Sequence, residues 1–206
     1  MRISVSSVIA ISVLCLTLPA AASAFGIMQS AETIDKGVYK FTISPLMHFG
    51  SDGADDEFGV AARAGYGFSD KFDAEAKLGF FENVTLVGLD GEYWLVKDKQ
   101  VDVSLGAGLH FGFAGDDGFD SMGIELTPLA SGHISENLEL YGALAVSLEK
   151  LSDVPEPLDD SYTSIQLVPG LEYKVSENID LVGEFGLGLN DDSSDYAGVG
   201  IAFYLR

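Results

Sequence analysis

His133 and Ser135 are the residues of the chain whose types and spacing best suit nucleophilic catalysis. A serine hydroxyl becomes a nucleophile when a base such as histidine lies within hydrogen-bond reach. Glu136 follows this serine, and the same Ser-Glu-Asn sequence recurs at Ser176 with no histidine before it. The repeat favours a turn over a catalytic pair. We therefore expect no enzymatic activity and no catalytic residue.

Clusters of acidic residues at 52–57, 116–120 and 191–195 could in principle bind Ca²⁺. None of them fits the twelve-residue loop of an EF-hand. The three histidines also lack the His-x-His or Glu-x-x-His spacing that is typical of metal sites. The sequence therefore predicts solvated acidic loops, with no metal site and no cofactor.

A larger set of ionisable residues shares one face of alternating segments. Its bases are Lys40, Arg63 and Lys77. Its acids are Asp73, Glu75, Asp90, Glu92, Asp102, Glu125, Glu139, Glu172, Asp180 and Glu184. If this face is enclosed, opposite charges must pair or meet water. We expect a salt-bridge and water network there, and the alternative is a narrow pore in which excess carboxylate favours cations.

The elements that position these charges are strands, because apolar residues alternate with glycine or polar residues over long stretches. From Val101 to Phe113 every odd position is apolar and every even position is glycine or polar. Ten such strands are predicted, at 38–49, 58–68, 72–81, 86–96, 101–113, 123–134, 138–148, 162–173, 179–189 and 196–205. Short polar turns alternate with acidic, mostly longer loops. This rhythm predicts an all-β, antiparallel up-and-down meander.

The two faces of the predicted strands differ in size rather than only in polarity. One face carries many small residues, among them Gly65, Gly106 and Gly198, and the other carries Leu, Val, Phe and Tyr. Small residues suit the inside of a narrow barrel, and the bulky face suits lipid. A strand of ~9–11 residues crosses a bilayer when tilted, and closure is then required because an open edge in lipid leaves backbone groups unsatisfied. We therefore predict a transmembrane β-barrel.

Composition and the first residues define the remaining organisation. A net charge of −21 excludes a nucleic-acid partner, since phosphate binding needs a basic surface. Residues 1–24 are predicted to be a signal peptide that ends at Ala22-Ser23-Ala24 and contains Cys15, the chain's single cysteine. We interpret residues 25–36 as a short periplasmic N-terminal tail and residues 37–206 as the barrel.

The predicted mature chain resembles the small bacterial outer-membrane β-barrels that include the OmpA-like and OmpX-like proteins. The resemblance consists of the signal peptide, the rhythm of short turns and long loops, and a final strand like the family's assembly signal, with Gly198, Gly200, Ile201, Phe203 and Leu205. Arg206 departs from that pattern by adding a terminal charge. Eight strands, usual in OmpA-like barrels, are the alternative to ten.

The resemblance implies a Gram-negative outer membrane, with both termini in the periplasm. The expected partners are outer-membrane lipid, lipopolysaccharide and the outer-membrane assembly machinery, while the partner of the surface loops stays unknown. The first functional hypothesis is a structural or surface-interaction role with a lumen filled by charges. The alternative is a narrow cation-preferring porin. The third is a lipid A-modifying enzyme, because lipid A deacylases are small barrels with a His-x-Ser pair, although in that family Asn directly follows the Ser, where this chain has Glu136.

Overall fold

The computed structural model describes residues 25–206, apart from 51–54, 99, 116–118, 153 and 155–158. The predicted signal peptide, and parts of the acidic clusters at 52–57 and 116–120, lie outside the described residues. In the described part of the chain no helix has the length and apolar character to cross a membrane.

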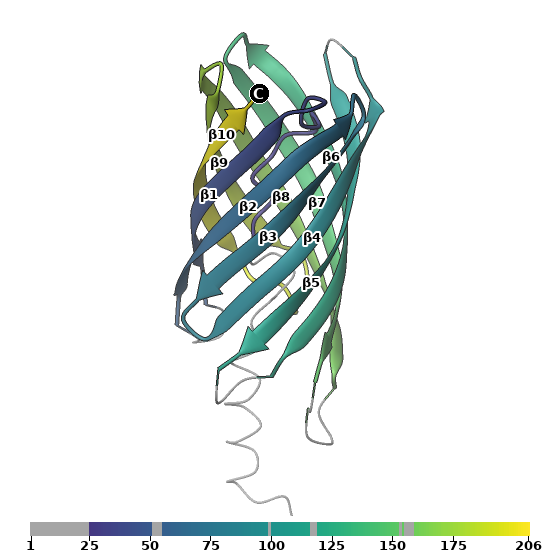
Figure 1. Cartoon of the computed structure of the whole chain (residues 1–206). Coiled ribbons are helices and arrows are strands. Elements are labelled where there is room, and N and C mark those ends of the chain that lie inside the picture. Colours follow the sequence, from purple (N-terminus) through teal and green to yellow (C-terminus); the bar gives the residue numbers. More distant parts are fainter. Residues whose placement is uncertain (1–24, 51–54, 99, 116–118, 153, 155–158) are drawn as a thin grey trace, which may run out of the picture.

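The described residues form ten antiparallel strands that close into a barrel (Figure 1). The strands are β1 (Tyr39–His48), β2 (Glu57–Ser69), β3 (Phe72–Phe81), β4 (Val84–Val96), β5 (Asp102–Ala114), β6 (Ser121–Ser135), β7 (Leu138–Leu151), β8 (Ser161–Ser176), β9 (Ile179–Gly188) and β10 (Tyr196–Leu205). Each strand pairs with its neighbours in sequence, and β1 pairs with β10. The prediction of a ten-stranded up-and-down barrel is confirmed, and the eight-stranded alternative is excluded.

Three of the short turns share one local structure, which explains their similar sequences. The hydroxyls of Ser69, Ser135 and Ser176 each accept a hydrogen bond from the backbone N–H two residues later, at 3.3, 3.4 and 3.3 Å. A serine hydroxyl that bonds its own backbone in this way stabilises a tight turn. Ser135 is therefore a turn residue, and the turn accounts for the serine at this position without any role for His133.

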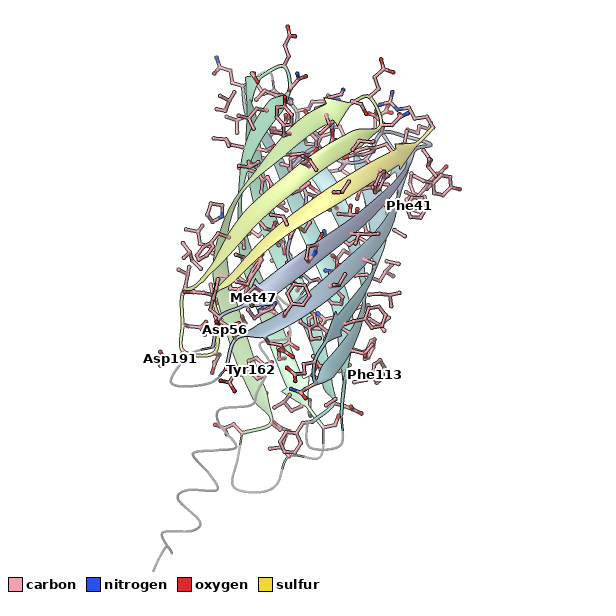
Figure 2. All side chains as sticks on the ribbon, turned by 90° about the vertical axis from the view of Figure 1, so that its left-hand side faces the viewer. Phe41, Met47, Asp56, Phe113, Tyr162 and Asp191 are labelled. Atoms are coloured by element: carbon pink, nitrogen blue, oxygen red, sulfur yellow. The ribbon has the colours of Figure 1, made fainter. Side chains whose placement is uncertain are left out.

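The outer face of the barrel is apolar along its length. Large side chains such as Ile124, Leu148 and Phe203 are between 40% and 59% exposed, and they alternate with buried residues. Figure 2 shows Phe41 and Phe113 standing away from the wall on the outside. An apolar belt of this kind is what a barrel presents to lipid, so the assignment of the bulky face to the outside is correct.

Residues 25–36 do not form a periplasmic tail, so that prediction is wrong. Phe25, Met28 and Ala31 are at most 1% exposed, and this stretch runs inside the barrel before the chain turns into β1 (Figure 1). We call residues 25–36 the luminal segment. Its apolar side chains and its unpaired backbone groups both find partners on the inner face of the wall, which a free tail in water would not offer.

The barrel has two distinct ends. The turn end carries the short connections and the ends of β1 and β10 near Tyr39 and Leu205, and the loop end carries the acidic connections. We expect the loop end to face the cell exterior. A protease-site tag inserted between Asp191 and Asp192 should be cut on intact cells, whereas one inserted between Glu177 and Asn178 should be cut only after lysis. Cleavage of the second tag alone would mean the opposite orientation.

Candidate functional site

Glu184 of β9 is the central anchor of the luminal segment. Its carboxylate accepts hydrogen bonds from the backbone N–H groups of Ile27 and Met28, both at 2.7 Å. It also accepts the hydroxyls of Tyr141 and Tyr196, both at 2.6 Å. Four donors from three parts of the barrel therefore converge on one buried carboxylate, which is 7% exposed. Hydrogen bonds to a charged acceptor are among the stronger ones in proteins.

Four other wall residues bind the luminal segment along its length. Arg63 donates to the carbonyl oxygens of Gly26 and Ile27. Asp73 accepts the N–H of Ile34 at 2.6 Å, and Ser131 accepts the N–H of Ala31 at 3.1 Å. Glu92 accepts the side-chain amide of Gln29 at 2.6 Å. The wall thus satisfies backbone donors and acceptors that the segment, which is not in a sheet, cannot pair by itself.

The luminal segment takes a conformation that depends on these contacts. Gly26 has a φ of +64°, and Met28 has a φ of +52°, which is uncommon for a residue with a side chain. The N–H of Met28 is one of the two backbone donors held by Glu184. At the other end of the segment, a Cβ on Gly67 would collide with the carbonyl oxygens of Ile34 and Asp35. Glycine at this position of the wall lets the segment pass directly against the backbone.

An ion-pair cluster occupies the lumen beside the segment. Arg63 lies 3.3 Å from Glu75 and 3.6 Å from Asp90, and Lys77 pairs with the same Asp90. Lys40 lies 4.0 Å from Glu75. All three bases are at most 5% exposed, so each would be costly to bury without its acidic partner. The structure therefore brings together five of the residues predicted to share the lumen.

The remaining acids of the predicted set lie elsewhere on the inner face. Glu125 accepts the hydroxyl of Thr127 at 2.9 Å, and Asp102 accepts the N–H of Asp98 at 3.2 Å. Glu139, Glu172 and Asp180 line a cavity at the turn end. Glu125 also borders the small cavity beside Arg63 and Asp90, and Glu172 is hydrogen-bonded to Asp180.

The residues proposed as an assembly signal alternate along β10. Ile201, Phe203 and Leu205 are 40% to 59% exposed on the outer face. A Cβ on Gly198 would meet Met28 and Leu46, and one on Gly200 would meet the Ser44 hydroxyl. The inward glycines of this strand thus make room for the luminal segment and for β1.

Sequence reasoning also missed a buried pair beside the start of the luminal segment. His110 lies 2.8 Å from Glu149, which also accepts the Ser147 hydroxyl. The rings of Phe25 and His110 pack edge to face. The Lys77 ammonium lies over the Phe25 ring, 4.8 Å from its centroid. Both His110 and Glu149 lie on the inward face of their strands, so their alternation with apolar residues was a signal that could have identified them.

Two tyrosines of the anchor depend on glycines opposite them. A Cβ on Gly186 would overlap the ring of Tyr196, and one on Gly170 would overlap Tyr141. We expect Gly186→Ala to displace Tyr196 from Glu184 and to lower the free energy of unfolding by about 1–3 kcal/mol. Gly183→Ala is the matched control, because a Cβ there, on the same strand, meets nothing within 4 Å. Chemical unfolding followed by Trp94 fluorescence measures both, and equal effects would contradict this account of Gly186.

Two cavities border the luminal segment. A cavity of about 20 Å³, bordered by Ile27, Gln29, Arg63 and Glu92, is large enough for about one water molecule. A larger cavity of about 340 Å³ lies at the turn end, between the luminal segment and the ends of β6 to β10. The luminal segment and the ion pairs thus occupy the inside of the barrel next to the small cavity, and the larger cavity, which we call the vestibule, opens at the turn end.

The His133 and Ser135 side chains have separate partners. His133 lies 3.1 Å from Glu32, and the Ser135 hydroxyl accepts the N–H of Asn137. In this arrangement the serine hydroxyl is held by its own turn and not by the histidine.

Comparison with known proteins agrees with the architecture. Residues 8–203 match the model of the family described as outer membrane protein beta-barrel domain. No curated protein matches the chain.

Among solved structures, outer-membrane barrels match this chain at low sequence identity, and the first of the three named here shares its fold. An outer-membrane channel from Pseudomonas putida F1 has a TM-score of 0.59 and 9% identity, over 87% of this chain and 98% of that one. The Yersinia pestis outer membrane protein Ail has a TM-score of 0.44 and 16% identity, over 82% and 100% of the two chains. The KdgM porin has a TM-score of 0.47 and 10% identity, over 81% and 99%. With its closed barrel, its apolar outer face and a family match over almost its whole length, the chain belongs to the outer-membrane β-barrel proteins.

Proposed function

We propose that this protein is a sealed, non-enzymatic outer-membrane barrel with a structural or surface-interaction role. The observation that carries the proposal is the luminal segment, which is bonded to the wall by Glu184, Arg63, Asp73 and Ser131. A barrel that conducts solutes needs a continuous water path. Here the cavity between the luminal segment and Arg63 and Glu92 has room for about one water molecule.

The surroundings proposed for this role follow from the membrane location. The barrel is exported through a signal peptide, residues 1–24, that is then cleaved. It is inserted by the assembly machinery that recognises β10, and it lies among outer-membrane lipid and lipopolysaccharide. Its loop end presents exposed acids such as Asp56 and Asp191 (Figure 2). Beside anionic lipopolysaccharide these acids would interact through divalent cations or with a basic partner rather than directly.

A narrow cation-preferring porin is the second candidate, and a specific feature favours it. Carboxylates outnumber bases on the inner face, and the luminal segment, although continuous with β1, has no covalent cross-link to the rest of the wall. If the segment left, the remaining wall would attract cations. The two functions therefore differ in whether the luminal segment stays in place.

Planar-bilayer conductance distinguishes the two candidates. We expect the refolded protein starting at Phe25 to show no steady conductance, and a variant lacking residues 25–34 to form open channels that favour cations in a salt gradient. Reversal potential gives the selectivity, and migration of unheated samples on gels shows that both barrels are folded. Steady cation-selective conductance of the complete mature chain would replace the sealed barrel with the porin.

A disulfide provides the reciprocal control. The chain after residue 24 has no cysteine, and the backbone of Ala31 lies against Ser131, with the N–H 3.1 Å from the hydroxyl. Cysteines at these two positions should hold the segment in place when oxidised. Any rare openings seen in the wild-type barrel should be absent from the oxidised double-cysteine variant and should return when that variant is reduced. If channel openings of the double-cysteine variant are equally frequent after oxidation and after reduction, the luminal segment does not control these openings.

A further inference from the structure

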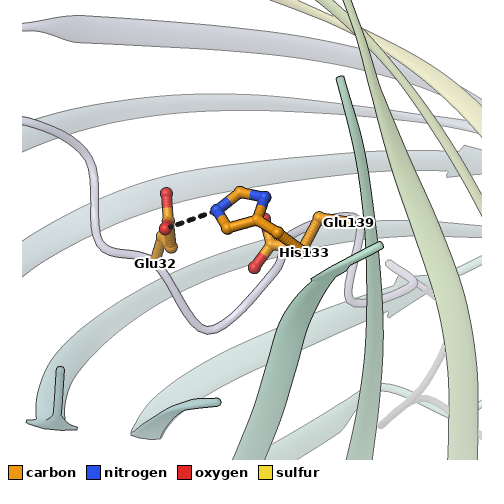
Figure 3. Close-up of side chains that lie close together, drawn as sticks. All are labelled: Glu32, His133 and Glu139. Carbon is orange, nitrogen blue, oxygen red and sulfur yellow. Dashed lines mark hydrogen bonds and ion pairs between the residues drawn. The ribbon is translucent and has the colours of Figure 1, made fainter. Parts of the chain in front are cut away.

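Three potential metal ligands from three separate elements meet at the turn end of the lumen (Figure 3). Glu32 comes from the luminal segment, His133 from the end of β6, and Glu139 from the start of β7. One ligand atom from each side chain lies within 4.8 Å of the others. The positions 32, 133 and 139 have no motif spacing, which is why the sequence predicts no metal site.

Strand pairing fixes two of the three ligands. His133 and Glu139 are direct partners in the β6–β7 register, just before the irregularity between His133 and Ser135. Directly opposed residues of antiparallel strands project from the same face with their Cβ atoms about 5 Å apart. Glu32 approaches this pair from the lumen, and its Oε1 lies 3.1 Å from Nε2 of His133.

The hydrogen bonds of the cluster leave one ligand atom unused. Glu139 is 5% exposed, and the hydroxyls of Ser30 and Ser131 bond its carboxylate, but its Oε1 has no hydrogen-bond donor among the described residues. His133 bonds Glu32 through Nε2, so this contact supplies no donor to Oε1 of Glu139. A buried carboxylate oxygen without a donor is costly. A divalent cation would compensate all three side chains together.

We infer that Glu32, His133 and Glu139 form a binding site for a divalent transition metal ion of the Zn²⁺ class. One imidazole nitrogen and two carboxylate oxygens are ligands that Zn²⁺ accepts, and at bond lengths of about 2.1 Å tetrahedral ligands lie about 3.4 Å apart. The separation of 3.1 Å between Glu32 and His133 is close to that value. Small rotations of the side chains complete the arrangement.

The surroundings give the ion access and attract it. All three ligands line the cavity of about 340 Å³ at the turn end, which leaves room for water at a fourth position. Seven carboxylate side chains border this cavity against three lysines or arginines. Such an excess of negative charge in a recess concentrates cations. His133 and Glu32 are 49% and 40% exposed, so the ion reaches them directly.

The consequence of the site goes beyond the sealing proposed above. Since Glu32 belongs to the luminal segment and the other two ligands belong to the wall, a bound ion fastens the segment to the barrel at the turn end. Ion binding and the seal are separate properties, because Glu184 and Arg63 hold the segment deeper in the lumen.

Titration of the refolded full mature barrel with Zn²⁺, and with Co²⁺ as a spectroscopic probe, tests the site. We expect one equivalent to bind, with visible Co²⁺ bands that report a nitrogen ligand. His133→Ala and Glu32→Gln should each weaken binding by at least about 10–100-fold, since even residues that only support ligands have effects of this size. Both side chains are partly exposed, so both variants should fold.

Glu136→Gln is the matched control, because it removes one charge from the same cavity without touching the cluster. Glu136→Gln should leave the Zn²⁺ affinity and the visible Co²⁺ bands unchanged. Hydrogen exchange of the amides around Glu32 should slow on addition of Zn²⁺ in the wild type and not in His133→Ala. The proposal is overturned if the wild type shows no saturable Zn²⁺ binding, or if Glu136→Gln loses as much affinity as His133→Ala. It is also overturned if Glu32→Gln binds Zn²⁺ as tightly as the wild type, because the luminal segment would then supply no ligand.

Discussion

Replacing Glu184 by glutamine should lower the free energy of unfolding by about 2–5 kcal/mol. The carboxylate accepts four hydrogen bonds from Ile27, Met28, Tyr141 and Tyr196. An amide group of the same shape has one acceptor oxygen, and its nitrogen can only donate. Some of the four donors are then left buried without an acceptor, and each unsatisfied group costs about 1–3 kcal/mol. Urea unfolding in lipid vesicles, followed through Trp94, the chain's single tryptophan, gives the value.

Two variants that each remove one tyrosine hydroxyl provide a comparison for the effect of Glu184→Gln. Tyr141→Phe and Tyr196→Phe each remove one donor and leave the carboxylate with three, so each should have a smaller effect than Glu184→Gln. Hydrogen exchange at Ile27 and Met28 should become faster in Glu184→Gln and change less in the tyrosine variants. If Glu184→Gln proved as stable as the wild type, Glu184 would not be the anchor of the luminal segment.

Replacing Leu144 by arginine should destabilise the folded barrel by ~2–4 kcal/mol, because its side chain lies on the outer face in the middle of β7. An arginine there has to stay near the bilayer midplane or distort the lipid around it. Reversible unfolding in vesicles measures the change.

Val175→Arg is the control for depth, since Val175 is an outward residue at the turn end of β8 and is 53% exposed. The cost of arginine falls to about 0–1 kcal/mol near the interface. A similar loss at both positions would mean that the apolar face does not span the hydrocarbon as described.

The strands could be predicted from sequence because each one carries its own evidence. Between Val101 and Phe113 the alternation of apolar and small or polar residues predicts both a strand and its lipid-facing side. The structure has β5 at Asp102–Ala114. The shared Ser-Glu-Asn of two turns likewise reflects one local hydrogen bond to a serine hydroxyl. Strand periodicity and turn hydrogen bonds depend on residues that are close in the chain, so they can be predicted from the sequence before the fold is known.

The luminal segment could not be predicted in this way, because everything that holds it is distant in sequence. Glu184 lies 157 residues from Ile27, and Ser131 lies 100 residues from Ala31. The segment has no alternation that would indicate a strand, and its partners on the wall look like ordinary inward charges. Its apolar residues Phe25, Ile27 and Ile34 were the available sign that it is not a free tail. The inward orientation of Lys40, Arg63 and Lys77 followed from alternation, but their choice of partners did not.

The pairing of β1 with β10 has a consequence for how the molecule is made. The barrel's seam joins the first and last strands, so it can form only when nearly the whole chain is in place. The luminal segment leads directly into β1 through Gly37, whose N–H bonds the Gly67 carbonyl at 2.8 Å. Closure of the seam therefore encircles the segment, and a segment left outside would afterwards have to thread through a narrow mouth. Pairing between sequence-distant strands is slow, and this delay gives the segment time to take its place before the ring is complete.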